Sequence, residues 1–165
     1  MASKEFFDGI ASRLSDNGFA VSRNIELVQC TLRVVGKSTD FEVRYLNILS
    51  NYVLVTEMGN VDVGGAEDFS GKCWRYALED RRFRLPRPLG GGLITVAVIA
   101  SHDFNEEIKE WARSRPLQLH LAGAESIMLV SLNNQETFFR KEPPLVLGRA
   151  FNRDIGKIAK LIATR

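Results

Sequence analysis

The sequence predicts one α/β domain in which a mixed central sheet is flanked by helices. Three observations support this fold class. Stretches with apolar residues at helical spacing alternate along the chain with stretches of strand pattern. Two strand patterns, residues 52–56 and 93–100, are almost continuously apolar, which is typical of central strands covered on both faces. The length of 165 residues, with 45% hydrophobic and 25% charged side chains, suits a single globular domain.

The first half of the chain predicts a helix followed by a meander of three strands. The helix spans residues 3–17, with Ser3 as the N-cap and Asn17-Gly18 as a left-handed stop. Residues 25–35 form the first predicted strand, and a turn at residues 36–39 leads into the second, residues 41–49. A tight turn at Ser50-Asn51 then leads into the apolar strand 52–56.

The second half predicts helices that alternate with strands. A helix is expected over residues 66–82, and a Pro/Gly connector over residues 85–92 leads to the strand 93–100. A cap within residues 101–105 begins a further helix that runs to residue 113, and short strands follow at 117–121 and 127–132. An amphipathic helix over residues 151–162 ends the pattern. The expected order is α-β-β-β-α-β-α-β plus a C-terminal helix.

The composition restricts the expected partners and compartment. The formal net charge is only +2, so any binding of nucleic acid must come from a local basic patch. Cys30 and Cys73 lie in apolar surroundings without metal-ligand spacing, which favours reduced thiols over a disulfide. No segment has the roughly 18 uninterrupted apolar residues of a membrane span, and the N-terminus lacks an apolar stretch of signal length. A cytoplasmic protein without membrane contact is the expectation.

Two carboxylates flank the middle of the predicted meander. Asp40 precedes the second strand, and Glu57 ends the third. Two hard oxygen ligands at the ends of neighbouring strands can hold Mg²⁺, which polarises a scissile phosphate and lowers the pKa of the attacking water. The alternative for Asp40 is a turn residue that satisfies backbone donors. For Glu57 it is a solvated carboxylate at a strand end, so both interpretations stay open.

Four segments, in sequential order, resemble those of a known nuclease superfamily. They are LSDNGF at residues 14–19, TDFEVR at 39–44, YVLVTEMG at 52–59 and the strand, turn and helix of residues 93–112. With these segments, residues 5–132 resemble the restriction-endonuclease-like superfamily, the PD-(D/E)XK nucleases, and are most similar to its Mrr-type and archaeal Holliday-junction-resolvase-type members. Residues 133–165 are then a C-terminal extension of that core. The family opens its second strand with an aspartate and ends its third with E-x-K.

The resemblance implies metal-dependent cleavage of phosphodiester bonds in DNA. It makes Asp40 and Glu57 the catalytic ligands of Mg²⁺, with Asp8 on the first helix as a further metal-binding acid. The family lysine orients the attacking water and offsets charge on the phosphate, but here Gly59 stands in its place. Lys72 or Arg75 on the following helix could supply the missing charge; otherwise the site is inactive.

A basic run follows these carboxylates. Six cations and only two acids occur within residues 72–87, the cations being Lys72, Arg75, Arg81, Arg82, Arg84 and Arg87. Such a run suits contacts with the DNA backbone, which position a protein without reading sequence. The alternative is a solvated helix face on which ion pairs form at helical spacing, such as Arg75 with Glu79.

His102-Asp103 and the adjacent Ser101 contain the three residue types of a hydrolase triad. Neighbouring residues point apart, however, and a triad is assembled from distant segments. Capping of the next helix by Asp103 or Asn105 is the favoured interpretation.

Three functional hypotheses follow. The first is a nuclease-fold domain with a degenerate site that associates with DNA and cleaves it only if Mg²⁺ still binds. The second is a catalytically inert binding or scaffolding module, forming a homodimer through a strand edge or the C-terminal helix. The third is a small-molecule-binding α/β domain with the same element order. Gly59 favours the second over the first, and the modest net charge favours the second and third.

Overall fold

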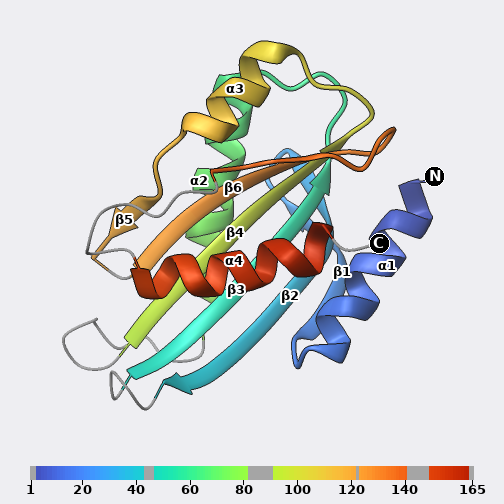
Figure 1. The fold of residues 1–165 in the computed structure, drawn as a ribbon. Helices are drawn as coiled ribbons and strands as arrows, with labels where there is room; N and C mark the ends of the chain where they lie inside the picture. Colours follow the sequence, from blue (N-terminus) through green and yellow to red (C-terminus); the bar gives the residue numbers. More distant parts are fainter. Residues whose placement is uncertain (1–2, 43–46, 82–90, 122, 141–148, 164–165) are drawn as a thin grey trace.

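Seven strands in the described part of the chain form one mixed, open sheet at the centre of the molecule (Figure 1). The computed structural model describes residues 3–42, 47–81, 91–121, 123–140 and 149–163. The order across the sheet is β1-β2-β3-β4-β6-β5, and β7 also pairs with β6. The strands are β1 (Ala20–Leu27), β2 (Cys30–Glu42), β3 (Asn47–Glu57), β4 (Gly91–Ser101), β5 (Gln118–His120), β6 (Gly123–Ser131) and β7 (Thr137–Phe138).

Strand directions divide the sheet into two parts. β1, β2 and β3 form an antiparallel meander, whereas β3, β4 and β6 run parallel to one another. The helices α2 (Val63–Asp80) and α3 (Glu106–Ser114) lie in the connections between the parallel strands. Every residue from 93 to 100 in β4 is fully buried, as predicted for an apolar strand covered on both faces.

Helices cover both faces of the sheet and give the molecule three layers (Figure 1). The helices α1 (Ser3–Asp16) and α4 (Arg149–Ala163) share one apolar cluster with Val53 and Val55 of β3. The helices α2 and α3 share a second cluster with Tyr52 and Leu54. Successive residues of β3 therefore face opposite layers, as the period of a strand requires. The α/β class and the mixed sheet with flanking helices are confirmed.

The first hairpin turn of the meander does not lie where the sequence predicted. It falls at Val28-Gln29, where Gln29 has a positive φ of 71°, and β2 continues without interruption through residues 36–39. Gly36 lies inside this strand and does not form a turn. A Cβ at this position would come within 2.9 Å of Leu14 Cδ1, so the absence of a side chain gives α1 room to pack on β2.

The second turn is also displaced from its predicted position. Ser50 and Asn51 lie inside β3, which begins at Asn47. β2 therefore begins at Cys30 and ends at Glu42, so Asp40 lies near its carboxyl end and not at its opening.

The helix ends agree with simple capping chemistry. Gly18 has a φ of 83° after α1, as predicted for a left-handed stop. Asp62 caps α2 by accepting a hydrogen bond from the Gly65 amide at 2.7 Å, and Asn105 caps α3 through the Ile108 amide at 2.9 Å. In the described ranges, no helix combines the length and apolar character needed to cross a membrane.

Candidate functional site

Asp40 belongs to a small polar cluster at the amino end of β3. It pairs across the two strands with Leu49. Asn51 Nδ2 donates to Asp40 Oδ2 at 3.1 Å and to Ser38 Oγ at 3.2 Å, and Ser38 Oγ donates to Asp40 Oδ2 at 3.3 Å. Ser38 and Asn51 are buried, whereas Asp40 is exposed. The cluster therefore joins a solvated carboxylate to two groups within the core.

Glu57 lies at the opposite end of β3 and has protein partners of its own. Its Oε2 accepts a hydrogen bond from Ser3 Oγ of α1 at 2.9 Å. Arg33 Nη2 of β2 lies 3.8 Å from the same oxygen. Both side chains are partly exposed, so this ion pair contributes only about 0–1 kcal/mol to stability. The Glu57 carboxylate is nevertheless oriented by two neighbours without a metal.

The structure does not bring Asp40 and Glu57 together. Asp40 pairs with Leu49, and Glu57 lies eight positions further along β3. At about 3.4 Å per residue, the two carboxylates are about 27 Å apart, so they cannot bind one metal ion. The prediction failed because β2 begins ten residues before Asp40. At the opening of β2, where the resemblance requires an aspartate, the chain has Cys30-Thr31-Leu32-Arg33.

Gly59 is exposed and lies two residues after Glu57, the last residue of β3. A Cβ built there would meet no heavy atom within 4 Å, so no steric reason requires glycine. The Gly59 carbonyl accepts a hydrogen bond from Ser101 Oγ at 2.9 Å. Space for a longer side chain is present, but the cation that the resemblance requires is not.

Lys72 does not replace the missing lysine. Its Nζ lies 2.7 Å from Asp68 Oδ2 and 3.0 Å from Gln29 Oε1. Lys72 belongs to α2, whereas Glu57 is held by Ser3 of α1 on the other face of the sheet. The sheet therefore separates the ammonium group from the carboxylate that it was predicted to assist.

Asp8 is engaged in a different ion pair. Its carboxylate accepts a hydrogen bond from Arg23 of β1, which lowers the pKa of Asp8. In the residues that the structure describes, no group of three or more histidine, cysteine, aspartate or glutamate side chains could hold a metal ion. Asp8, Asp40 and Glu57 therefore do not form such a group.

The basic run is only partly within the described residues. Arg75 is exposed on α2, and Arg81 caps the carboxyl end of that helix. The Nε and Nη1 atoms of Arg81 are buried and have no hydrogen-bond partner. The predicted DNA-contacting residues Arg82, Arg84 and Arg87 lie outside the described residues.

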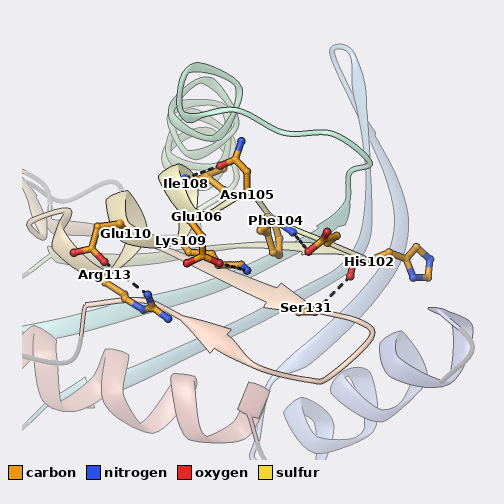
Figure 2. A network of polar contacts seen from close by, with 10 residues as sticks. His102, Phe104, Asn105, Glu106, Ile108, Lys109, Glu110, Arg113 and Ser131 are labelled. Carbon is orange, nitrogen blue, oxygen red and sulfur yellow. Dashed lines mark hydrogen bonds and ion pairs between the residues drawn. The ribbon is translucent and has the colours of Figure 1, made fainter.

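The residues after β4 form a helix cap and not a triad. Figure 2 shows His102 pointing away from α3, while the Asn105 side chain turns back to the Ile108 amide. Asp103 Oδ1 accepts from the Phe104 amide at 2.8 Å, and His102 Nδ1 lies 3.3 Å from Asn133 Oδ1. The capping interpretation is confirmed for Asn105.

A cavity of about 490 Å³ lies beside the Asp40 cluster and was not predicted from the sequence. It is bounded by β2, β3, the end of α1 and α4. Its lining residues are Asn17, Gly18, Phe19, Ser38, Asp40, Leu49, Asn51, Asp154, Lys157, Ile158, Lys160 and Leu161. The available signal was Asn51, a polar residue inside an otherwise apolar strand pattern, which was interpreted as a turn.

A second polar cluster, around Glu125 of β6, was also missed. This carboxylate is 5% exposed and accepts a hydrogen bond from Ser70 of α2. Arg115 Nη2 lies 3.4 Å from Oε1, and His120 Nε2 lies 3.0 Å from Oε2. The His120 ring stacks on Trp74 with a centroid distance of 4.1 Å. All these groups hold α2, β5 and β6 together.

A third polar contact joins α2 to the meander. Tyr52 Oη donates to Asp80 Oδ2 at 2.9 Å, and Lys37 Nζ lies 2.7 Å from the same oxygen. Burial raises the pKa of Tyr52, and the hydrogen bond to Asp80 raises it further. Burial also tends to raise the pKa of Asp80, but the hydrogen bonds from Lys37 and Tyr52 outweigh it and hold this pKa below its ordinary value.

Comparisons with known proteins give this chain no relatives: no family model, curated protein or solved structure matches it. The interpretation of its sites therefore depends on the geometry described above.

Proposed function

We propose that this chain is a catalytically inert binding module with an α/β/α architecture. The observation that supports this proposal is the separation of Asp40 and Glu57 by the length of β3. Cleavage by the predicted mechanism requires both carboxylates on one metal ion, together with a nearby cation. Within the described residues neither carboxylate belongs to a group that could hold a metal ion, and the cation nearest to Glu57, Arg33, is paired with that carboxylate itself.

The surroundings of Glu57 support the same proposal. A metal-binding carboxylate needs free lone pairs directed at the ion. Here Ser3 donates to Oε2 and Arg33 lies 3.8 Å from it, so protein groups already engage this oxygen. Through these contacts Glu57 connects the start of α1 to β2 and β3.

A cleavage assay tests the proposal. Purified protein is incubated with supercoiled plasmid and with branched DNA, in Mg²⁺ or Mn²⁺, beside the Glu57→Ala and Asp40→Ala variants. We expect no cleavage above the buffer background in any of the three. Metal-dependent cleavage by the unchanged protein that disappears in Glu57→Ala would contradict the proposal.

DNA remains a predicted partner of this module through the basic run that begins on α2. Exposed Arg75 favours it, because an arginine on a helix surface can contact phosphate without a shaped pocket. The affinity for a short DNA duplex is measured at about 50 mM and about 200 mM salt. We expect affinity to fall with salt and Arg75→Ala to reduce the slope by about 1. Equal affinity at both salt concentrations would exclude this partner.

A further inference from the structure

The cavity between β2, β3 and α4 has the size and composition of a small-ligand site. Its volume of about 490 Å³ falls within the range of roughly 300–1,000 Å³ that is usual for such sites. Phe19, Leu49 and Ile158 contribute apolar surface, and Ser38, Asp40 and Asn51 contribute polar groups from the sheet. An apolar wall with a few convergent polar groups is the usual composition of a ligand pocket.

Asn51 provides an independent observation. The residue is 6% exposed, and its Oδ1 is buried without a hydrogen-bond partner. The orientation of the amide follows from its neighbours, because Asp40 Oδ2 accepts from Ser38 as well and therefore faces Nδ2 and not Oδ1. Both contacts of Nδ2, to Asp40 and to Ser38, fix Oδ1 as the unsatisfied atom. Buried carbonyl oxygens rarely stay unpaired in native proteins.

The charges around the cavity indicate which ligand would suit it. Two carboxylates and two ammonium groups line it, Asp40 and Asp154 against Lys157 and Lys160. Lys157 Nζ lies 3.4 Å from Asp154 Oδ1, so these two opposite charges of α4 compensate each other. Lys160 has an interaction partner as well. On the sheet side, Asp40 contributes a carboxylate whose hydrogen bonds among the described residues come from Ser38 and Asn51, and Asn51 contributes an amide whose Oδ1 has no partner.

We propose that this cavity binds a small organic cation with an amine or amidine head and an apolar body. The head donates to the Asp40 carboxylate and to Asn51 Oδ1, and the apolar body lies against Phe19, Leu49 and Ile158. Binding of this ligand satisfies the acceptor that the protein alone leaves unpaired. The site uses Asp40 but not Glu57, which lies at the other end of β3.

Benzamidine is a suitable probe because it combines a planar donor head with an apolar ring. It is titrated into ¹⁵N-labelled protein of residues 1–165, beside benzoate, which has the same shape and the opposite charge. We expect benzamidine to shift the amide signals of residues 17–19, 38–40, 49–51 and 157–161, with a Kd on the order of 1 mM. Benzoate is expected to leave these signals in place.

Two variants and a matched control identify the acceptors. Asp40→Asn keeps the size of the side chain and removes its charge, and we expect at least a tenfold weaker response to benzamidine. Asn51→Val removes the unpaired oxygen and is expected to weaken binding similarly. Glu107→Gln removes an exposed carboxylate from α3 on the other face of the sheet, and it is expected to bind like the unchanged protein.

Three results would overturn the proposal. They are no signal change with benzamidine, equal changes with benzamidine and benzoate, and an unaltered response in Asp40→Asn. If Asn51→Val does not fold, Asp40→Asn still decides the outcome, because residue 40 is exposed and the asparagine Oδ1 can still accept hydrogen bonds from Ser38 and Asn51.

Discussion

At the scale of single residues, buried polar groups are the clearest constraint on this chain. Glu125 has three donors around one carboxylate, from Ser70, Arg115 and His120. Arg115 is also nearly buried, with 10% of its side chain exposed, and its Nε lacks a partner. A charge pair of this kind costs little while it is complete, but removing one member leaves the other uncompensated.

Glu125→Gln therefore destabilises the protein. Glutamine keeps the shape but loses the charge, and its NH₂ group would face donors from Ser70 or His120. We expect a loss of about 3 kcal/mol in the free energy of unfolding, measured by urea titration. The matched control is Glu107→Gln on the exposed face of α3, which should stay within about 0.5 kcal/mol of the unchanged protein. A Glu125→Gln value equal to that control would contradict the role given to this cluster.

The two cysteines differ in exposure, and this difference predicts their reactivity. Cys73 is fully buried, and its burial raises the pKa of its thiol well above the ordinary value. Cys30 is only partly buried. Because the thiolate is the reactive form, a thiol reagent at pH 8 should modify Cys73 only after unfolding. Mass spectrometry after labelling with and without urea checks this expectation, and rapid labelling of Cys73 in the folded protein would refute it.

At the scale of elements, the sequence pattern predicted the four helices better than the strands: the expected order has five strands, whereas the described residues form seven. The apolar strands within residues 52–56 and 93–100 and the helices follow from local periodicity. The stop at Gly18 and the cap at Asn105 follow from residue type, whereas Ser3, predicted as an N-cap, lies inside α1 and donates to Glu57. The predicted turns at Gly36 and Asn51 are wrong, although both residue types favour turns when considered alone. Gly36 serves the packing of Leu14 against β2, and Asn51 serves hydrogen bonds to Asp40 and Ser38. Both roles depend on residues distant in sequence, so no local pattern could reveal them.

The misplaced first turn also explains why the predicted metal site of Asp40 and Glu57 is wrong. Asp40 was assigned to the opening of a strand because the turn was placed before it. Moving that turn to Val28-Gln29 moves Asp40 to the far end of β3 and separates it from Glu57. The cavity and the Glu125 cluster need side chains from several elements, and therefore only the folded arrangement shows them.

Two glycines with opposite surroundings test how tightly the elements fit. A Cβ on Gly123, at the start of β6, would lie 1.7 Å from the Leu93 carbonyl oxygen, so Gly123→Ala forces β4 and β6 apart. We expect a loss of about 3 kcal/mol. Gly71, inside α2, has no atom within 4 Å of that position, and Gly71→Ala should raise stability by about 0.5–1 kcal/mol. Both values come from chemical denaturation, and a stable Gly123→Ala protein would contradict this register.

At the scale of the whole molecule, the contact of Asp80 with Tyr52 and Lys37 couples stability to pH. The pKa of Asp80 is lower in the folded chain, so its contribution is present above its unfolded pKa of about 3.8 and is lost as the pH falls through the folded value. The pKa of Tyr52 is raised, so its contribution is present below about pH 10 and is lost as the pH rises further.

The free energy of unfolding should therefore decline at both ends of the pH range. Asp80→Asn is expected to make the acid decline shallower, and Tyr52→Phe the alkaline decline. Urea titrations at a series of pH values measure both slopes. Unchanged slopes in the two variants would assign the pH dependence to other groups.

The stack of Trp74 on His120 gives the protein an optical signal of its own. An imidazole stacked on an indole changes the surroundings on which the indole fluorescence depends, and here the two rings come from α2 and from the short strand β5. The chain has only one other tryptophan, Trp111 on α3, so comparison with His120→Leu isolates the effect of this contact on Trp74. Fluorescence at low protein concentration can therefore follow the docking of β5 on α2 without any attached dye.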